Sequence, residues 1–151
     1  MCYIITISTD KPDDLAVHNF DGIYFEKVDK PLFKSVLAYP NMYEIATMAQ
    51  GSCSCHLRIF DEPLSKEMGF CELQDWLGES DDDDDILRTR SLFEFIKELV
   101  NQGFKVDSFV SWNDDSPSEI GEYHTKKVPV NTLPKEQFAF FEHWYFEYIM
   151  D

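Results

Sequence analysis

Residues 86–112 read ILRTRSLFEFIKELVNQGFKVDSFVSW, and this stretch decides the fold class. In its first part apolar side chains recur at helical spacing, which predicts an amphipathic helix over 86–102. Gly103 suits the left-handed conformation that commonly ends a helix. The following residues, 105–112, are rich in β-branched and aromatic side chains and predict a strand. A helix that leads directly into a strand indicates a mixed α and β domain.

The segments on either side predict the rest of a sheet and a second helix. Runs of β-branched and aromatic residues predict strands at 2–9, 22–28 and 122–130, and a hairpin with arms 42–48 and 55–60. Aromatic residues at helical spacing, after a proline in the first turn, predict a helix over 133–149. We therefore expect one α+β domain over residues 1–151, with a mainly antiparallel sheet and two principal helices packed on it.

The charge of the chain excludes several kinds of partner. Thirteen basic residues against 29 acidic ones give 151 residues a net charge of −16. Such a surface repels nucleic acid and anionic lipid and favours a basic protein partner. The apolar runs are far shorter than the roughly 20 residues that span a bilayer, and the first residues lack the basic segment of a signal peptide. These features predict a cytoplasmic protein with reduced cysteines.

The segment CSCH at residues 53–56 gathers two thiols and an imidazole in a predicted turn. Zinc binds such side chains, and Cys71 or Cys2 is available as a fourth ligand. A single residue separates the two cysteines, whereas zinc motifs usually place about two to four between them. The leading prediction therefore includes no cofactor, and a zinc site is the alternative. Its candidate ligands are Cys53, Cys55, His56 and Cys71.

Three segments together resemble a family of small bacterial proteins of unassigned activity. They are the opening CYIITISTD at 2–10, the turn GSCSCHLR at 51–58 and the segment GFKVD at 103–107. The family shares a Cys-Ser-Cys-x-x-Arg element and an aromatic C-terminal helix. The resemblance implies a single bacterial cytosolic domain and carries no activity with it.

Two acidic loops and the aromatic C-terminal segment form a candidate partner surface. Acidic loops speed association with a basic protein, and aromatic side chains left over from the core provide contact area. Solvated loop charge and a helix buried on two sides are the structural alternatives. The candidate contact residues are Asp81, Asp82, Asp83, Asp114, Asp115, Phe140 and Trp144.

The sequence favours a binding protein over an enzyme. It contains no phosphate-binding glycine loop, no dinucleotide fingerprint and no Gly-x-Ser-x-Gly element. The leading prediction is a non-enzymatic acidic protein of the immunity or inhibitor kind, which neutralises a basic partner such as a toxin domain. The alternatives are a small metal- or thiol-dependent enzyme centred on Cys53, Cys55 and His56, and a homodimer that uses the C-terminal helix.

Overall fold

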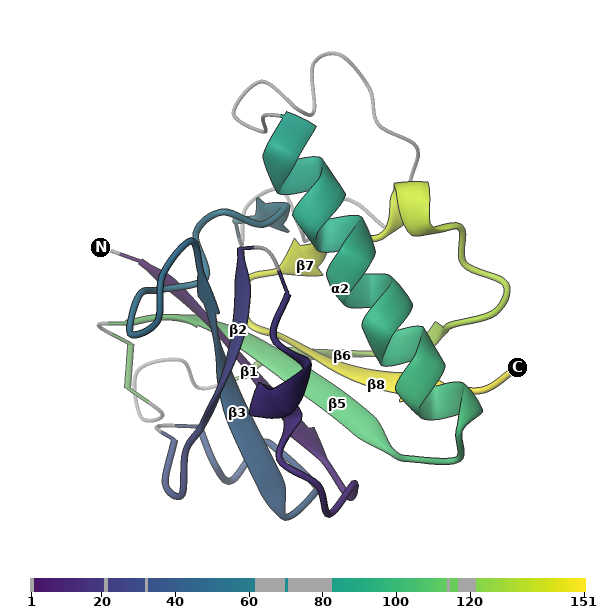
Figure 1. Cartoon of the computed structure of the whole chain (residues 1–151), viewed down its shortest axis with the longest axis horizontal. Coiled ribbons are helices and arrows are strands. Elements are labelled where there is room, and N and C mark those ends of the chain that lie inside the picture. The colour runs from purple at the N-terminus through teal and green to yellow at the C-terminus, as the bar shows by residue number, and fades with distance from the viewer. Residues whose placement is uncertain are drawn as a thin grey trace.

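The computed structural model describes residues 2–20, 22–31, 33–61, 70, 83–113, 115–116 and 122–151. Six strands form one twisted sheet in the order β2-β3-β1-β5-β8-β6 (Figure 1). They are β1 (Tyr3–Thr9), β2 (Ile23–Lys27), β3 (Asn41–Thr47), β5 (Val106–Trp112), β6 (His124–Pro129) and β8 (Trp144–Ile149). All neighbouring pairs are antiparallel except β6 and β8, which run parallel. The expected mainly antiparallel α+β fold is therefore confirmed.

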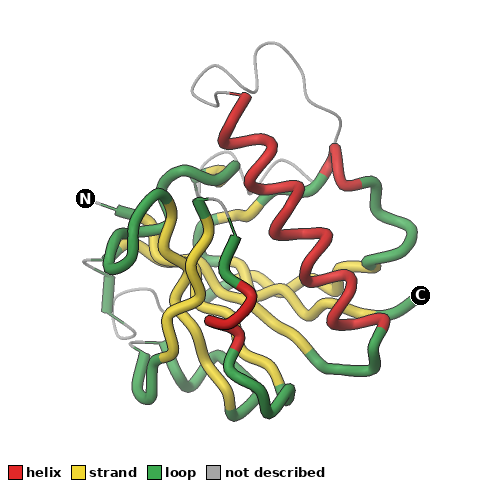
Figure 2. The backbone as a smooth tube through the Cα atoms, in the orientation of Figure 1, coloured by secondary structure: helices red, strands yellow, loops and turns green. Residues whose placement is uncertain are grey.

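Strand β1 lies in the middle of the sheet, and both of its faces are covered. Ile5 and Ile7 belong to the main core, which they share with helix α2 (Asp83–Asn101). The helix lies across that face of the sheet (Figure 2). On the other face Phe33 and Leu37 pack against Phe109 in a second, smaller cluster. The strand ends in a run of five buried residues, as expected for a central strand with both faces covered.

Helix α2 confirms the helix expected at 86–102. Its buried side chains fall on one stripe: Leu92, Phe93, Ile96, Leu99 and Val100, with Thr89 one turn and Asp85 two turns before Leu92. The helix ends as predicted, because Gly103 has a φ of +97° and its N–H donates to Val100 O at 3.0 Å. Phe104 N–H reaches Leu99 O at 3.1 Å, which completes a Schellman cap. Within the described ranges, no helix has the length and apolar character needed to cross a bilayer.

The helix expected over 133–149 is wrong. Those residues form a short 3-10 helix (Lys135–Gln137), strand β7 (Phe140–Phe141) and strand β8. His143 has a φ of +63° in the turn between the two strands, a conformation that no α-helix contains. Aromatic residues favour strands, and β8 buries alternate residues, Phe146 and Tyr148. Among the described residues α2 is therefore the one α-helix.

The hairpin expected between 42–48 and 55–60 is also wrong. Strand β3 is present, but it pairs with β1 and β2. The second arm is reduced to β4 (Ile59–Phe60), which pairs in parallel with β7 in a separate two-stranded sheet. The segment between β3 and β4 instead turns back along the start of β1. This path places the cysteines beside the N-terminal end of the central strand.

Substitution of Gly22 by alanine is expected to destabilise the fold more than substitution of Gly51. Both glycines have a φ near +80°, which costs an L-residue about 1–2 kcal/mol. A Cβ at Gly22 would also lie 2.8 Å from Arg88 Cδ, whereas nothing lies within 4 Å of a Cβ at Gly51. Arg88 donates from Nη2 to Asp85 Oδ1 at 2.5 Å and from Nε to His56 O at 3.0 Å, so its displacement would disturb both hydrogen bonds. In urea unfolding, Gly22→Ala should lower the free energy of unfolding by roughly 1 kcal/mol more than Gly51→Ala does. Equal losses for the two variants would contradict the contact with Arg88.

Candidate metal centre

The turn that carries Cys53 and Cys55 is fixed to the sheet by backbone bonds. Thr47, the last residue of β3, donates its N–H to Cys53 O at 2.9 Å. Ser54 N–H donates to Tyr3 O at 2.9 Å, so the segment continues the sheet beyond the end of β3. The short stretch 48–52 folds back between these contacts, with positive φ at Met48 and Gly51. The turn therefore lies beside the first residues of β1.

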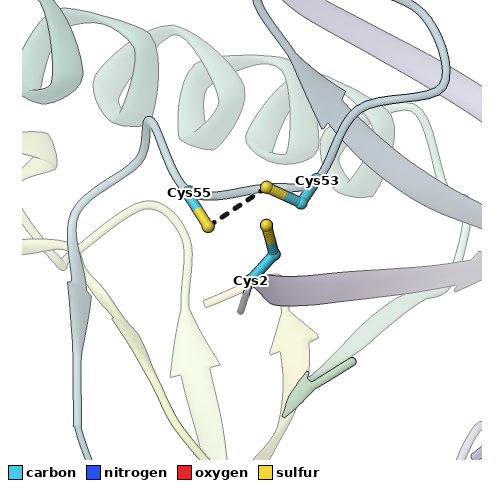
Figure 3. Close-up of side chains that lie close together, drawn as sticks. All are labelled: Cys2, Cys53 and Cys55. Atoms are coloured by element: carbon cyan, nitrogen blue, oxygen red, sulfur yellow. Dashed lines mark hydrogen bonds between the residues drawn. The ribbon is translucent and has the colours of Figure 1, made fainter. Parts of the chain in front are cut away.

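Ser54 holds the turn from the inside. It is fully buried, and its hydroxyl accepts the N–H of Ile5 at 2.9 Å and donates to Ile45 O. Cys53 and Cys55 flank Ser54, and Figure 3 shows their side chains facing Cys2.

Cys2 is held in place by Asn113, the residue after β5. Its N–H donates to Asn113 Oδ1 at 3.3 Å, and its carbonyl accepts Asn113 N–H at 2.9 Å. The next residue, Tyr3, donates its N–H to Cys55 Sγ at 3.2 Å. The ring of Tyr3 stacks on Trp112 with centroids 4.2 Å apart. The backbone around Cys2 is thus fixed on two sides, by β5 and by the cysteine turn.

The three thiols form one cluster. The sulfur atoms of Cys2, Cys53 and Cys55 all lie within 4.8 Å of one another, and all three side chains are half-buried (Figure 3). The sulfur atoms of Cys53 and Cys55 lie 3.1 Å apart. That distance exceeds the roughly 2.05 Å of a disulfide, and the three cysteines are free thiols. We call this group the thiol cluster.

The thiols of the cluster differ in acidity. Burial raises the pKa of Cys55 to about 12, and its hydrogen bond to Cys53 adds to the rise. The hydrogen bond to Cys53 likewise raises the pKa of Cys2. Burial also acts against ionisation of Cys53, but hydrogen bonds from the other two cysteines outweigh it and lower the pKa of Cys53. The surroundings therefore favour ionisation of Cys53 over that of Cys2 and Cys55.

A set of sulfur donors in this arrangement has a defined chemistry. Thiolates are soft ligands that select Zn²⁺, Cu⁺ or iron–sulfur clusters over hard cations such as Mg²⁺ and Ca²⁺. Thiolates at about 2.3 Å from a common ion lie roughly 3.8–4 Å from one another. The sulfur separations in the cluster are compatible with that spacing after sub-ångström to ångström shifts. The cluster can therefore hold one soft ion.

The structure brings together some of the residues expected at this site. Cys53 and Cys55 are in the cluster, and Cys2, which the sequence offered as an additional ligand, is its third member. His56 is not in the cluster; its Nδ1 lies 3.9 Å from Asp85 Oδ1, and the side chain is 53% exposed. Cys71 lies outside the described residues. Asn113 was not predicted from the sequence, which shows no local signal for its contact with Cys2.

Four of the seven residues expected to form a partner surface lie in the described part of the chain, in differing surroundings. Asp83 is exposed in the first turn of α2, whereas Asp115 accepts Trp112 N–H and lies 2.8 Å from His143 Nε2. Trp144 is half-buried and its ring lies 4.8 Å from that of His124, centroid to centroid. Phe140 is fully buried, so its expected exposure to a partner is wrong. The remaining three, Asp81, Asp82 and Asp114, lie outside the described residues.

No family model, curated protein or solved structure matches this chain. A proposal for its function therefore rests on the thiol cluster and its surroundings.

Proposed function

We propose that the protein binds a soft metal ion through the thiolates of Cys2, Cys53 and Cys55. The observation that supports it is the convergence of three sulfur atoms within 4.8 Å from two segments that are far apart in sequence. Cysteines gathered only by a local turn would include Cys53 and Cys55 alone. Cys2 reaches them because β1 and the turn after β3 are neighbours in the sheet.

The surroundings of the cluster support a ligand role. In metal–thiolate sites, groups around the ligands orient them and tune their basicity. Here the N–H of Tyr3 donates to Cys55 Sγ, and Asn113 fixes the backbone of Cys2 by two hydrogen bonds. The hydroxyl of Ser54 fixes the turn between the other two ligands. Ligand positions are therefore set by the fold before an ion arrives.

The other functions expected from the sequence stay predictions. A basic protein partner follows from the charge of −16, and homodimerisation, a cytoplasmic location and the resemblance to small bacterial proteins rest on sequence alone. Homodimerisation loses its proposed contact element, because the C-terminal helix is absent. Metal binding is compatible with either a binding protein or a metal-dependent enzyme.

The test is titration of the reduced protein with soft metal ions under anaerobic conditions, followed by native mass spectrometry. One ion per chain is expected for the unmodified protein. Each of the variants Cys2→Ser, Cys53→Ser and Cys55→Ser should weaken binding by more than about 100-fold, since loss of an outer-shell group alone costs roughly 10–100-fold. Serine is close to cysteine in size, and circular dichroism checks the fold of each variant. Stoichiometric binding that survives all three substitutions would refute the site.

Metal binding is expected to strengthen as the pH rises. The ion must displace the protons of Cys2 and Cys55, and the pKa of each is raised. For Cys55 the main cause is burial, and for Cys2 it is the hydrogen bond to Cys53. Above the pKa of Cys53 two protons are released per ion, so the apparent affinity should rise about 100-fold per pH unit. Below that pKa the third proton steepens the dependence. A titration in weak buffer measures the number of protons released per bound ion. Release of no protons would exclude thiol ligands.

A further inference from the structure

We propose, building on the metal site above, that the ion is monovalent copper, Cu⁺, held in three-coordinate geometry by the three cysteine sulfurs. The ligand class is the soft thiolate, and the number of donors distinguishes copper from zinc. Both ions are bound by thiolates, so the proposal rests on coordination number and on what surrounds the cluster.

The described part of the chain places three donors at the cluster. Among the residues that the structure describes, no histidine, aspartate, glutamate or further cysteine joins the group formed by Cys2, Cys53 and Cys55. His56 follows Cys55 directly in the sequence. Its Nδ1, however, lies 3.9 Å from Asp85 Oδ1 on helix α2, and its carbonyl oxygen accepts a hydrogen bond from Arg88 Nε at 3.0 Å. The nearest imidazole in sequence is thus directed to another partner.

Three sulfur donors complete the shell of Cu⁺ but leave a vacancy on Zn²⁺. Structural zinc sites are almost always tetrahedral with four protein ligands. A catalytic zinc uses three protein ligands and a water molecule, and the known sets of that kind contain histidine or carboxylate as well as cysteine. A d¹⁰ monovalent ion has no such requirement, and three thiolates in a plane satisfy it. The donor set of sulfur alone also matches the softer of the two ions.

The negative charge around the cluster favours Zn²⁺ over Cu⁺, but its effect is weaker than that of the sulfur donor set. The chain carries −16, and the side chains of Glu142 and Asp61 lie near enough to raise the pKa of Tyr3, although burial contributes more to that rise. A negative environment favours a divalent ion over a monovalent one. The cluster is half-buried, however, and solvent screens charges that are not in direct contact. The metal–sulfur bonds are direct contacts, so the donor set decides.

The partial exposure of the cluster also suits an exchangeable ion. All three cysteines are half-buried and none is sealed in the core. The ion therefore has an entry path, and a thiolate or other soft ligand of a donor molecule can approach a three-coordinate centre without removing a protein ligand first. A structural zinc site, in contrast, is closed by its fourth ligand.

The experiment compares the two ions on the same reduced, anaerobic protein. Cu⁺ is titrated against a chromophoric Cu⁺ chelator and Zn²⁺ against a chromophoric zinc chelator, and the copper-loaded protein is studied by X-ray absorption. One Cu⁺ per chain, three sulfur neighbours at about 2.2–2.3 Å, and affinity at least roughly 1,000-fold above that for Zn²⁺ are expected. The matched control is Cys71→Ser, which removes the one cysteine that the described residues do not include. If the three sulfurs alone hold the ion, this change should alter copper affinity by less than about threefold, within the context spread of single interactions.

The outcomes separate the two proposals. Tighter binding of Zn²⁺ in a four-coordinate site that Cys71→Ser abolishes would overturn the copper assignment and leave the soft-metal function standing. Two-coordinate copper that Cys2→Ser does not weaken would overturn the three-sulfur geometry. Failure of the folded, fully reduced protein to bind either ion would overturn the proposed function and this inference with it.

Discussion

Saturation of the thiol cluster is expected to raise the free energy of unfolding by about 4 kcal/mol at a metal concentration 1,000-fold above the dissociation constant. An ion that binds the folded state stabilises it by the difference in affinity between folded and unfolded chains. Only the fold brings Cys2 to the other two thiols, because 50 residues separate Cys2 from Cys53. Thermal unfolding with and without the ion, at fixed free metal, measures the gain, which should raise the midpoint by roughly 10 °C.

Cys2→Ser is the matched control for this stabilisation. Cys53 and Cys55 are separated by one residue, so they remain close together in the unfolded chain and bind the ion there as well. The variant keeps this local pair, and its unfolding midpoint should respond little to metal. An equal shift in the variant and the unmodified protein would show that the ion acts through the local pair, and that the link between β1 and the turn contributes nothing.

Phe138→Ala is expected to destabilise the protein by about 3–5 kcal/mol, the usual cost of deleting a buried aromatic ring. Phe138 is 1% exposed. Its ring lies 4.4 Å from that of Phe93 on α2 and 4.9 Å from that of Phe140, centroid to centroid, and it also meets Phe146 on β8. The side chain therefore joins the helix to both C-terminal strands. Urea denaturation at neutral pH measures the loss.

Leu87→Ala serves as the control for the core substitution. Leu87 lies on α2 and is 56% exposed, and alanine favours a helix, so the change should stay within about 0.5 kcal/mol. Similar losses for the two variants would mean that Phe138 does not lie at the centre of the core. A small loss for Phe138→Ala would also weaken the assignment of residues 138–149 to strands packed under the helix.

Elements with strong periodicity were predictable from the sequence. The spacing of apolar residues before Gly103 predicted α2 and its cap, because both depend on local geometry. The strands β1 and β5 were predictable for a similar reason, since both are rich in β-branched and aromatic residues. Their pairing, from Tyr3 with Trp112 to Thr9 with Val106, depends on contacts about 100 residues apart that no local pattern contains.

The C-terminal segment was mispredicted because two periodicities compete in it. Phe138, Phe141, Tyr145 and Tyr148 fit a helical stripe, whereas Phe146 and Tyr148 fit the alternation of a strand. Packing between β5 and β6 decides in favour of the strand, and that neighbourhood is a property of the whole sheet. The same limit applies to the site: Cys53 and Cys55 stand out as a pair in the sequence, whereas Cys2 joins the thiol cluster only because β3 lies beside β1.

Strand β8 occupies an inner position of the sheet although it follows the other five strands of that sheet in the chain. During synthesis on the ribosome, the backbone groups of β5 that pair with β8 therefore stay unpaired until β8 emerges. The same holds for the groups of β6 that pair with β8. An unpaired edge in a nascent chain invites association with other chains. The protein thus depends on residues 144–149 to close the sheet, and a polypeptide interrupted just before β8 should be a target for chaperones and proteases.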